Sequence, residues 1–497
     1  MKRTKHSLSN YKLLSCDLGE LVPIGLTEVL AGDSIQQSTN ALIRAAPLLS
    51  PVMHPVNVSI AHWFVPHRLV WEDWESFITG GSDGMDASVF PTISLPPANH
   101  LLGSLADYLG IPPTPGVTLN PSALPFRAYA LIFNEWYRDQ DLVAPLDISL
   151  QSGSDITTNS ILQNAAWEKD YFTTCRPWEQ KGPAITIPIG TTAPVSGIGI
   201  KDGEVAAALG YNVRETAASS TFSTGVNATT GQALAIEAAA GAIGASNRPQ
   251  IFADLSNASA VSVNVLREAL ALQRYEEARA RYGSRYIEYL RYLGVRSSDA
   301  RLQRPEFLGG GKATIQFSEV LQTGEGTDPV GTLRGHGISS MRSNRYRRFF
   351  EEHGYVLTLL TARPKTIYAD GLARHWNRTT KEDFWQKELE HIGQQPVLNK
   401  EVRAAHASPN GTFGFQDRYD EYRRQFSTIA GEFRTTLDFW HFARQFGSDP
   451  ALNADFVKCV PTEEPFAVPS EDVLQIMARH SIQARRLVCG TGTSFIY

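Results

Sequence analysis

The chain has 497 residues, of which 42% are hydrophobic and 20% charged, a balance typical of globular proteins with a real core. The formal net charge is −5 at pH 7, which excludes a protein coated with nucleic acid on all sides and leaves room only for local contacts. The four cysteines are too scattered for a disulfide scaffold or a CxxC site, so a reducing compartment is indicated.

The N-terminal stretch "MKRTKHSLSN" is basic but is not followed by the apolar run of a secretory signal. No apolar run approaches the roughly 20 residues that a membrane-spanning helix needs. We therefore expect a protein that is made in a cytoplasm and does not insert into a membrane.

The first clear period lies in "HPVNVSIAHWFVPHRLVW", where Val56, Val58 and Ile60 alternate with polar or small residues. This alternation predicts a strand with one buried face, ending at Pro66. "WEDWESFITGG" predicts a short helix that ends at its glycines. Residues 86–185 are rich in proline and predict a loop insertion, with helices in "LLGSLADYLG" and "RAYALIFNEWYRD".

Residues 190–262 differ in character, because more than half are Gly, Ala, Ser or Thr and charge is sparse. Such a segment lacks the large side chains needed to build a core of its own, although "GQALAIEAAAG" could be helical. A flexible interdomain linker is the alternative, but ordinary linkers are shorter. We predict a surface insertion.

Residues 263–312 predict a long helix followed by a connecting segment. Asn264 is a candidate N-cap, Gly283 weakens the helix and Gly294 can end it. Tyr282, Tyr286, Tyr289 and Leu293 share one face, which we interpret as a packing stripe. In the stretch "SSDARLQRPEFLGGG", Pro305 breaks the helix, and the three glycines suggest a sharp exit into the next element.

Later in the chain, "HGYVLTLLTARP" is apolar on both faces and predicts a central strand, and "SIQARRLVCGTGTSFIY" could supply a last one. Strands are thus few, far apart in sequence and separated by helices and long loops. This pattern favours a mainly β protein, an antiparallel sandwich whose insertions exceed its sheets.

Catalytic motifs fail in their contexts. "GGSDG" matches the G-x-S-x-G elbow around Ser82, but no helical period follows it. "GGGK" has Glu306 where a phosphate loop needs glycine. His54, His62 and His67 lack a zinc spacing and are interpreted as structural. The His-hydrophobic-His pair of rolling-circle enzymes is missing. We expect no catalytic residues, no metal and no cofactor.

Two basic regions are candidates for nucleic-acid contact. The N-terminus carries Lys2, Arg3 and Lys5, and "MRSNRYRRFF" places Arg345 and Arg348 among aromatic rings. Arginine beside aromatic side chains can hold single strands by phosphate pairing and base stacking. For the arginine-aromatic cluster, a solvated basic face or intersubunit salt bridges are an at least equally good explanation.

"SSDARLQRPEFLGGG" resembles a stretch of the major capsid proteins of the Microviridae, the small tailless phages with circular single-stranded DNA, and is most similar to gokushovirus-like members. The block from "LVPIGLTEVL" to "WEDWESFITGG" resembles their N-terminal part. "EEHGYVLTLLTARP", "QPVLNKEV" and "FGFQDRYDEYR" resemble their C-terminal half in the same order. The similarity covers most of the chain and leaves out the Ala/Gly-rich insertion.

The resemblance implies a single discontinuous domain over residues 1–497, an eight-stranded antiparallel viral jelly roll with large helix- and loop-containing insertions. About sixty copies would form an icosahedral T=1 shell around single-stranded DNA. It also implies a virion protein, with scaffolding, pilot and small basic packaging proteins and a host surface receptor as partners. Residues 190–262 would form a threefold protrusion. The alternative is a jelly-roll carbohydrate-active or hydrolytic enzyme.

Overall fold

The computed structural model describes residues 3–183, 263–282, 285–321 and 331–489, together with residue 323 and short pieces between 185 and 253. The chain divides into two compact units, of which the larger comprises Met1–Lys181 and Glu277–Tyr497. The smaller unit is Gly182–Glu276, and most of its residues lie outside the described ones, as does the predicted helix at "GQALAIEAAAG". Its described strands are short: β8 (Val195–Ser196), β9 (Ile198–Ile200), β10 (Tyr211–Glu215), β11 (Gly225–Val226) and β12 (Phe252–Ala253).

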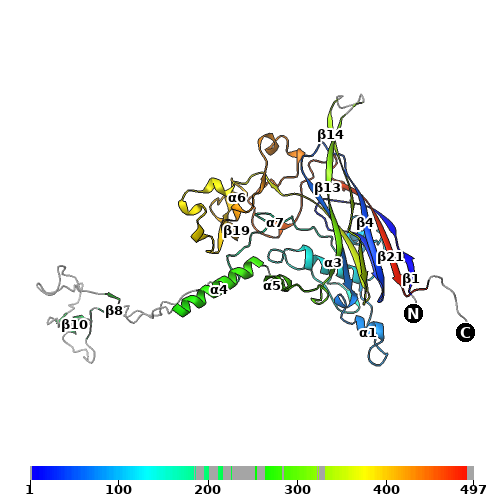
Figure 1. Ribbon diagram of the computed structural model, residues 1–497, viewed down its shortest axis with the longest axis horizontal. Coiled ribbons are helices and arrows are strands. Elements are labelled where there is room, and N and C mark those ends of the chain that lie inside the picture. Colours follow the sequence, from blue (N-terminus) through cyan, green and yellow to red (C-terminus); the bar gives the residue numbers. More distant parts are fainter. Residues whose placement is uncertain are drawn as a thin grey trace. The chain divides into compact units, whose positions relative to one another are not determined.

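The larger unit is mainly β, as predicted, and is built on one curled antiparallel sheet of ten strands (Figure 1). The main path runs β1-β21-β4-β14-β13-β5-β16-β3, with β2 also pairing with β21 and β15 with β4. The strands are β1 (Thr4–Ser7), β2 (Asn10–Cys16), β3 (Val22–Val29), β4 (Ser34–Ala45), β5 (Val56–Pro66), β13 (Glu306–Leu321), β14 (Leu333–Arg342), β15 (Tyr346–Phe349), β16 (Gly354–Pro364) and β21 (Leu474–Arg486).

Several predicted elements are confirmed. The strand at residues 56–66 is β5, and the doubly apolar segment is β16, which pairs with both β3 and β5. The last strand, β21, begins before the predicted tail. The short helices are α1 (Trp74–Thr79), α2 (Leu105–Leu109) and α3 (Leu124–Ile132), the last continuing as one π-helical turn over Phe133–Tyr137.

The expected glycine exit after Pro305 is wrong, because Gly309, Gly310 and Gly311 lie inside strand β13. This strand pairs with β5 over residues 306–315 and then with β14 over residues 316–321, with a register shift at Phe307/Gly309. A Cβ on Gly310 would lie 2.4 Å from the Ile60 carbonyl oxygen, closer than van der Waals contact permits. The glycines therefore let β13 approach its neighbours as it crosses from one part of the sheet to the other.

The helix predicted over residues 263–294 is two helices, α4 (Val263–Tyr282) and α5 (Tyr286–Tyr292). Asn264 is already helical, so its expected role as N-cap is wrong. Gly294 follows the end of α5 with φ +80°, as predicted. The interpretation of the aromatic stripe as packing is also wrong within this chain, since Tyr286 is 66% and Leu293 55% exposed.

The curled sheet encloses one apolar core and carries another on its outer face. Inside, Ile24, Ile43, Ile60 and Ile476 come from β3, β4, β5 and β21 and pack together. Outside, α2 and α3 cover the opposite face of β5 and β16, with Trp63 and Leu357 among the buried residues. Strands β5 and β16 are therefore buried on both faces, whereas β4, β14 and β21 have one side covered by the core.

A third cluster lies in the C-terminal half, where short elements surround Phe172, Tyr368, Val397, Phe413 and Phe456. These elements are β17 (Ile367–Tyr368), β18 (Gln394–Leu398), α6 (Asn399–Val402), β19 (Thr412–Asp417), β20 (Ser427–Thr428) and α7 (Ala454–Val457). Two further two-residue strands, β6 (Thr92–Ile93) and β7 (Ser154–Asp155), pair within the proline-rich insertion.

A buried polar seam crosses the interior of the curled sheet. The ring of His62 on β5 lies 2.9 Å from both the Thr358 and the Ser343 hydroxyls. His480 on β21 lies 2.9 Å from the Thr39 hydroxyl and 2.9 Å from the Ile24 carbonyl oxygen. These bonds tie β4 and β21 to β3, β5 and β16 across the core. Burial lowers the pKa of His62 to about 3 and also lowers that of His480.

We expect Gly310→Ala to lower the free energy of unfolding by roughly 2 kcal/mol or more, because the new methyl group must displace the backbone of β5. Gly447→Ala is the matched control, since nothing lies within 4 Å of its Cβ position. Urea unfolding of the isolated subunit measures both. Equal midpoints for the two variants would contradict the close approach in β13.

The seam also predicts a pH dependence. An unfolded histidine has a pKa of about 6.5, so between pH 6.5 and 3 the native chain binds fewer protons at His62 than the unfolded chain does. This contribution to stability is present above pH 6.5 and is lost as the pH falls. Glu20 acts oppositely, because burial raises its pKa to about 7. The melting temperature should therefore fall less steeply from pH 7 to 5 in His62→Gln than in the unaltered chain. The exposed His375→Gln is the control, and an identical slope in all three would refute the prediction.

Candidate nucleic-acid interface

Six neighbouring strands of the curled sheet, β1, β2, β4, β14, β15 and β21, are segregated in charge. About one residue in ten of the whole chain is acidic, yet these strands contain no Asp or Glu. They contain ten basic residues: Lys5, Lys12, Arg44, Arg334, Arg342, Arg347, Arg348, Arg479, Arg485 and Arg486. The chain is acidic overall, so this part of the sheet concentrates positive charge in one place.

Strand register places most of these cations on the side of the sheet that faces away from the core. Lys5 is paired with Arg485, and Arg485 with Ser34 on the next strand. Six residues further along β4, Arg479 and Arg342 lie on either side of Asn40. Because cross-strand partners point to the same face, these side chains share a surface. In Figure 1 the strands β1, β21, β4 and β14 lie side by side.

We call this surface the basic sheet face and define it by the exposed residues Arg3, Lys5, Arg44, Arg342, Arg345, Arg347, Arg479 and Arg485. Aromatic rings are interleaved with the cations. The Arg479 guanidinium lies over Tyr11 at 5.5 Å and that of Arg3 over Phe349 at 5.0 Å. Tyr11 is 64% and Phe349 47% exposed, so both rings remain accessible.

The structure brings together the two regions that the sequence suggested separately. Arg3 donates to the Ser34 hydroxyl at 3.2 Å, on the strand that also pairs with β15. The side-chain amide of Gln36, two residues further along β4, lies 3.1 Å from Arg345. Arg3, Lys5 and Arg345 therefore belong to one surface although more than 300 residues separate them in sequence. Lys2 lies outside the described residues.

Three basic side chains of these strands are already engaged elsewhere. Arg348 forms an ion pair with Glu306 at 2.7 Å, and burial nevertheless raises the pKa of Glu306. Arg486 pairs with the buried Asp33 at 2.9 Å. Lys12 turns inward to the Pro23 carbonyl oxygen, and burial lowers its pKa to about 8. Of the five residues proposed from the sequence, Arg348 is thus the one whose charge is locally neutralised.

The basic sheet face is electrostatically unfavourable by itself. Lys5 lies directly across from Arg485, and like charges at paired positions destabilise a sheet. A polyanion lying along the face would remove this repulsion and release counterions. Polar side chains between the cations, such as Gln475 and Gln483 on β21, can bond to phosphates or bases but do not form a code for one sequence.

Sequence reasoning missed Arg479 and Arg485, which lie in a strand that it did not connect with nucleic acid, whereas Arg342 belongs to the "MRSNRYRRFF" cluster. One feature of the sequence could have indicated the basic sheet face: neither "SIQQSTNALIR" nor "LQIMARHSIQARR" contains an acidic residue, although the two segments lie more than 400 residues apart. Only the pairing of β4 with β21 shows that they form one surface.

The structure places the other motifs away from any catalytic arrangement. Ser82 lies in an exposed turn that follows helix α1, not at the end of a strand. His54 bonds to the Lys365 carbonyl oxygen at 2.6 Å and His67 packs against Trp74, so the three histidines serve separate contacts. Among the described residues, no group of three or more His, Cys, Asp or Glu side chains is placed to hold a metal ion. None of the described helices is both long and apolar enough to cross a membrane.

Comparison with known proteins gives these features a context. The family described as "Capsid protein (F protein)" matches residues 1–494. A capsid protein VP1 of Bdellovibrio phage phiMH2K is 37% identical over 91% of this chain and 87% of its own length. The capsid protein VP1 of Chlamydia phage 1 is 31% identical over 95% of this chain and 92% of its own length. That of Spiroplasma virus 4 is 33% identical over 92% of this chain and 87% of its own length.

The structure is a large antiparallel sheet with long insertions and a broad charged face. Capsid proteins match nearly the whole chain, so the protein is a structural coat protein, a component of the virion. More particularly, the chain belongs to the capsid protein (F protein) family of phages. The resemblance to gokushovirus capsid proteins that the sequence motifs indicated is confirmed by the phage relatives.

We expect the double variant Arg479→Gln/Arg485→Gln to bind single-stranded oligonucleotides more weakly, because it removes two exposed cations from the basic sheet face. Each lost phosphate contact should reduce the slope of log K against log salt by about 0.7. Fluorescence anisotropy with oligodeoxythymidine over a range of salt concentrations measures this slope. Lys381→Gln, an exposed lysine outside the six strands, is the control, and a double variant with an unchanged slope would remove the face from consideration.

Proposed function

We propose that this coat protein assembles as about sixty copies into a T=1 icosahedral shell that encloses a circular single-stranded DNA genome. The curled ten-stranded sheet would supply the eight strands of a viral jelly roll, with the remaining strands as additions at its edges. In this arrangement the basic sheet face turns toward the interior. The single observation that carries the proposal is the exclusion of carboxylates from six adjacent strands of an acidic protein.

A packaged single strand fits the chemistry of this face. The cations can neutralise phosphates, while Tyr11 and Phe349 offer rings on which bases of any identity can stack. Polar side chains between them add hydrogen bonds without selecting a sequence. We therefore propose Lys2, Arg3, Lys5 and Arg345 as DNA contacts, joined by Arg479 and Arg485. Arg348 is a weaker contact because Glu306 already neutralises it.

Residues 190–262 are proposed to protrude outward at the threefold axes and to contribute to host attachment. Small side chains let three backbones approach closely, and sparse charge limits repulsion where three copies meet. Exposed insertions of this kind tolerate change better than a core does. Scaffolding, pilot and small basic packaging proteins, and a host surface receptor, are the proposed partners. No enzymatic activity is proposed, because capsid relatives account for nearly the whole chain.

Assembled particles test the orientation of the sheet. A density map of particles formed by this chain should show β4 and β21 on the inner surface, with Arg479 directed toward the genome. Particles whose β4 and β21 face outward would overturn the proposed DNA contact while leaving the coat function intact.

Deletion of residues 205–244 tests the insertion separately. The shortened chain should still fold and form shells, because the curled sheet is built without these residues, but its particles should attach to host cells at least tenfold less often. Electron microscopy and an attachment assay measure the two effects. A deletion that abolished folding of the subunit would show that the segment belongs to the core.

A further inference from the structure

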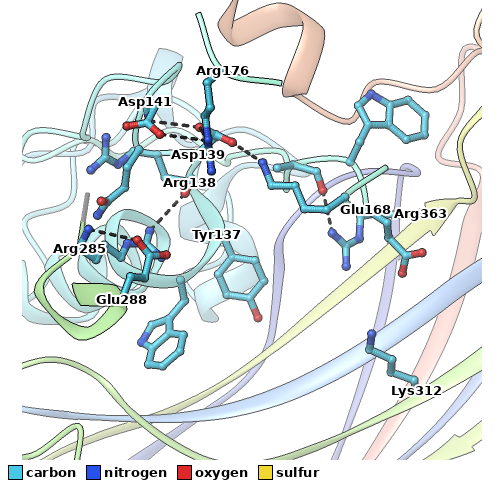
Figure 2. A pocket seen from close by; sticks show the side chains of 15 residues that line it. Tyr137, Arg138, Asp139, Asp141, Glu168, Arg176, Arg285, Glu288, Lys312 and Arg363 are labelled. Atoms are coloured by element: carbon cyan, nitrogen blue, oxygen red, sulfur yellow. Dashed lines mark hydrogen bonds and ion pairs between the residues drawn. The ribbon is translucent and has the colours of Figure 1, made fainter. Parts of the chain in front are cut away.

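A second positively charged site lies apart from the basic sheet face. It is a pocket of about 520 Å³, bounded by residues 136–141, residues 166–169, helix α5 and strands β13 and β16 (Figure 2). Six cationic side chains line it: Arg138, Lys169, Arg176, Arg285, Lys312 and Arg363. Figure 2 shows Arg285 and Glu288 at one end and Lys312 and Arg363 at the other. The pocket shares no residue with the basic sheet face.

The four acidic residues of the pocket do not neutralise all of these cations. Asp139 forms an ion pair with Lys169, and Asp141 forms one with Arg176 at 3.0 Å. Lys181 adds a further ion pair to Asp141, at 2.8 Å. The two aspartates are therefore fully used on the Lys169 side of the pocket.

Glu168 and Glu288 are also engaged. Glu168 accepts a hydrogen bond from the Asn57 amide at 3.1 Å. Glu288 accepts from the backbone N–H of Arg285, also at 3.1 Å, at the start of helix α5. Neither glutamate forms an ion pair with the guanidinium of Arg138, Arg285 or Arg363.

These three guanidiniums are held by backbone carbonyl oxygens instead. Arg138 donates to Val143 at 2.6 Å and Arg363 to Ala166 at 2.7 Å. Arg285 donates to Asn134 at 3.1 Å and to the backbone of Arg138 itself at 3.2 Å. In each arginine the Nε–H is buried and has no protein acceptor. The carbonyl bonds fix the position of each side chain without supplying a negative charge to balance it.

Neighbouring positive charges act on Arg285 and add to the excess of positive charge in the pocket. Burial is the main reason why the pKa of Arg285 is lowered, and the positive charges of Arg138 and Arg304 act in the same direction. The nearby carboxylates of Glu288 and Glu135 oppose the shift without reversing it. An anion beside Arg138 and Arg285 would therefore be strongly favoured.

The rings of Trp136 and Trp167 in the pocket already contact other side chains, and this limits the kinds of ligand that the pocket can bind. Trp136 lies against Trp63 at 4.7 Å between ring centres and has the Arg304 guanidinium over its face at 4.1 Å. Trp167 has Arg444 over its ring at 5.2 Å. The pocket is thus built to recognise charge and hydrogen-bond acceptors, not to stack a flat ring.

We propose that this pocket binds a phosphate group, either free or carried by a nucleotide, with the guanidinium groups of Arg138 and Arg285, which line the pocket, as its principal donors. The planar fork of arginine suits phosphate oxygens, and both forks are already fixed in place by carbonyl oxygens. Lys312 and Arg363 supply a second positive end of the pocket, where a further anionic group of the ligand can bind. The site is additional to the DNA contact proposed for the basic sheet face.

Calorimetric titration of the full-length subunit at constant ionic strength tests the proposal, with orthophosphate and deoxyadenosine monophosphate as the two probes and chloride as the balancing salt. We expect saturable binding of one phosphate per subunit. Arg285→Gln and Arg138→Gln should each weaken it at least tenfold. Arg479→Gln on the basic sheet face should leave it unchanged. Equal affinities for the two probes identify free phosphate as sufficient, whereas tighter deoxyadenosine monophosphate identifies a nucleotide.

The proposal is overturned if neither probe binds the unaltered subunit, or if binding survives in the pocket variants and is lost in Arg479→Gln. Should the glutamine variants fail to fold, Arg285→Lys keeps the charge but removes the Nε–H and the planar fork, and it should still weaken binding. A competition in the unaltered chain needs no variant: sulfate should displace phosphate and acetate should not. Failure of shell assembly would leave these results unaffected, because they concern the isolated subunit.

Discussion

The architecture depends on a backbone contact that admits no side chain. Strand β13 pairs first with β5 and then with β14, so it is the one strand of the main path that joins the doubly buried part of the sheet to the part with a free face. Gly310 and Gly311 let it pass within contact distance of the Ile60 and Arg342 carbonyl oxygens. Without that approach the sheet could not curl over its core, and the layers tied by His62 and His480 would not face each other.

The division between these two parts of the sheet explains why the molecule has the basic sheet face at all. Helices α2 and α3 cover the outer face of β5 and β16, so these two strands are buried on both sides. Among the described residues nothing comparable covers the outer faces of β4 and β21, and along each of these strands core residues alternate with polar or basic ones. Basic residues can be concentrated on that face because their side chains are not needed for packing against the described parts of the chain.

The elements that could be predicted from the sequence are those whose own residues have a strong hydrophobic pattern. Strand β16 is apolar on both faces and β5 alternates, so both were predictable. Strand β13 was not, because the glycine run in "FLGGGK" indicates a turn unless the neighbouring backbones are known. Strand β4 contains "SIQQSTN", whose buried Gln37 and Thr39 belong to the polar seam and hide the alternation. For the candidate interface, Arg3, Lys5, Arg342 and Arg345 were recognisable by local clustering, whereas Arg479 and Arg485 join them only through strand register.

The pairing of β21 with β1, β2 and β4 has a consequence for the order of events during synthesis. The basic sheet face is assembled from strands near residue 10, near residue 40 and near residue 480, with β21 in the middle. In a growing chain β4 can pair with β14 and β15 once about 350 residues have been made, but β1 and β2 lack their partner until β21 has been synthesised. The complete basic sheet face therefore exists only in the nearly finished subunit, and the nucleic-acid contact proposed for it would have to wait for the end of translation.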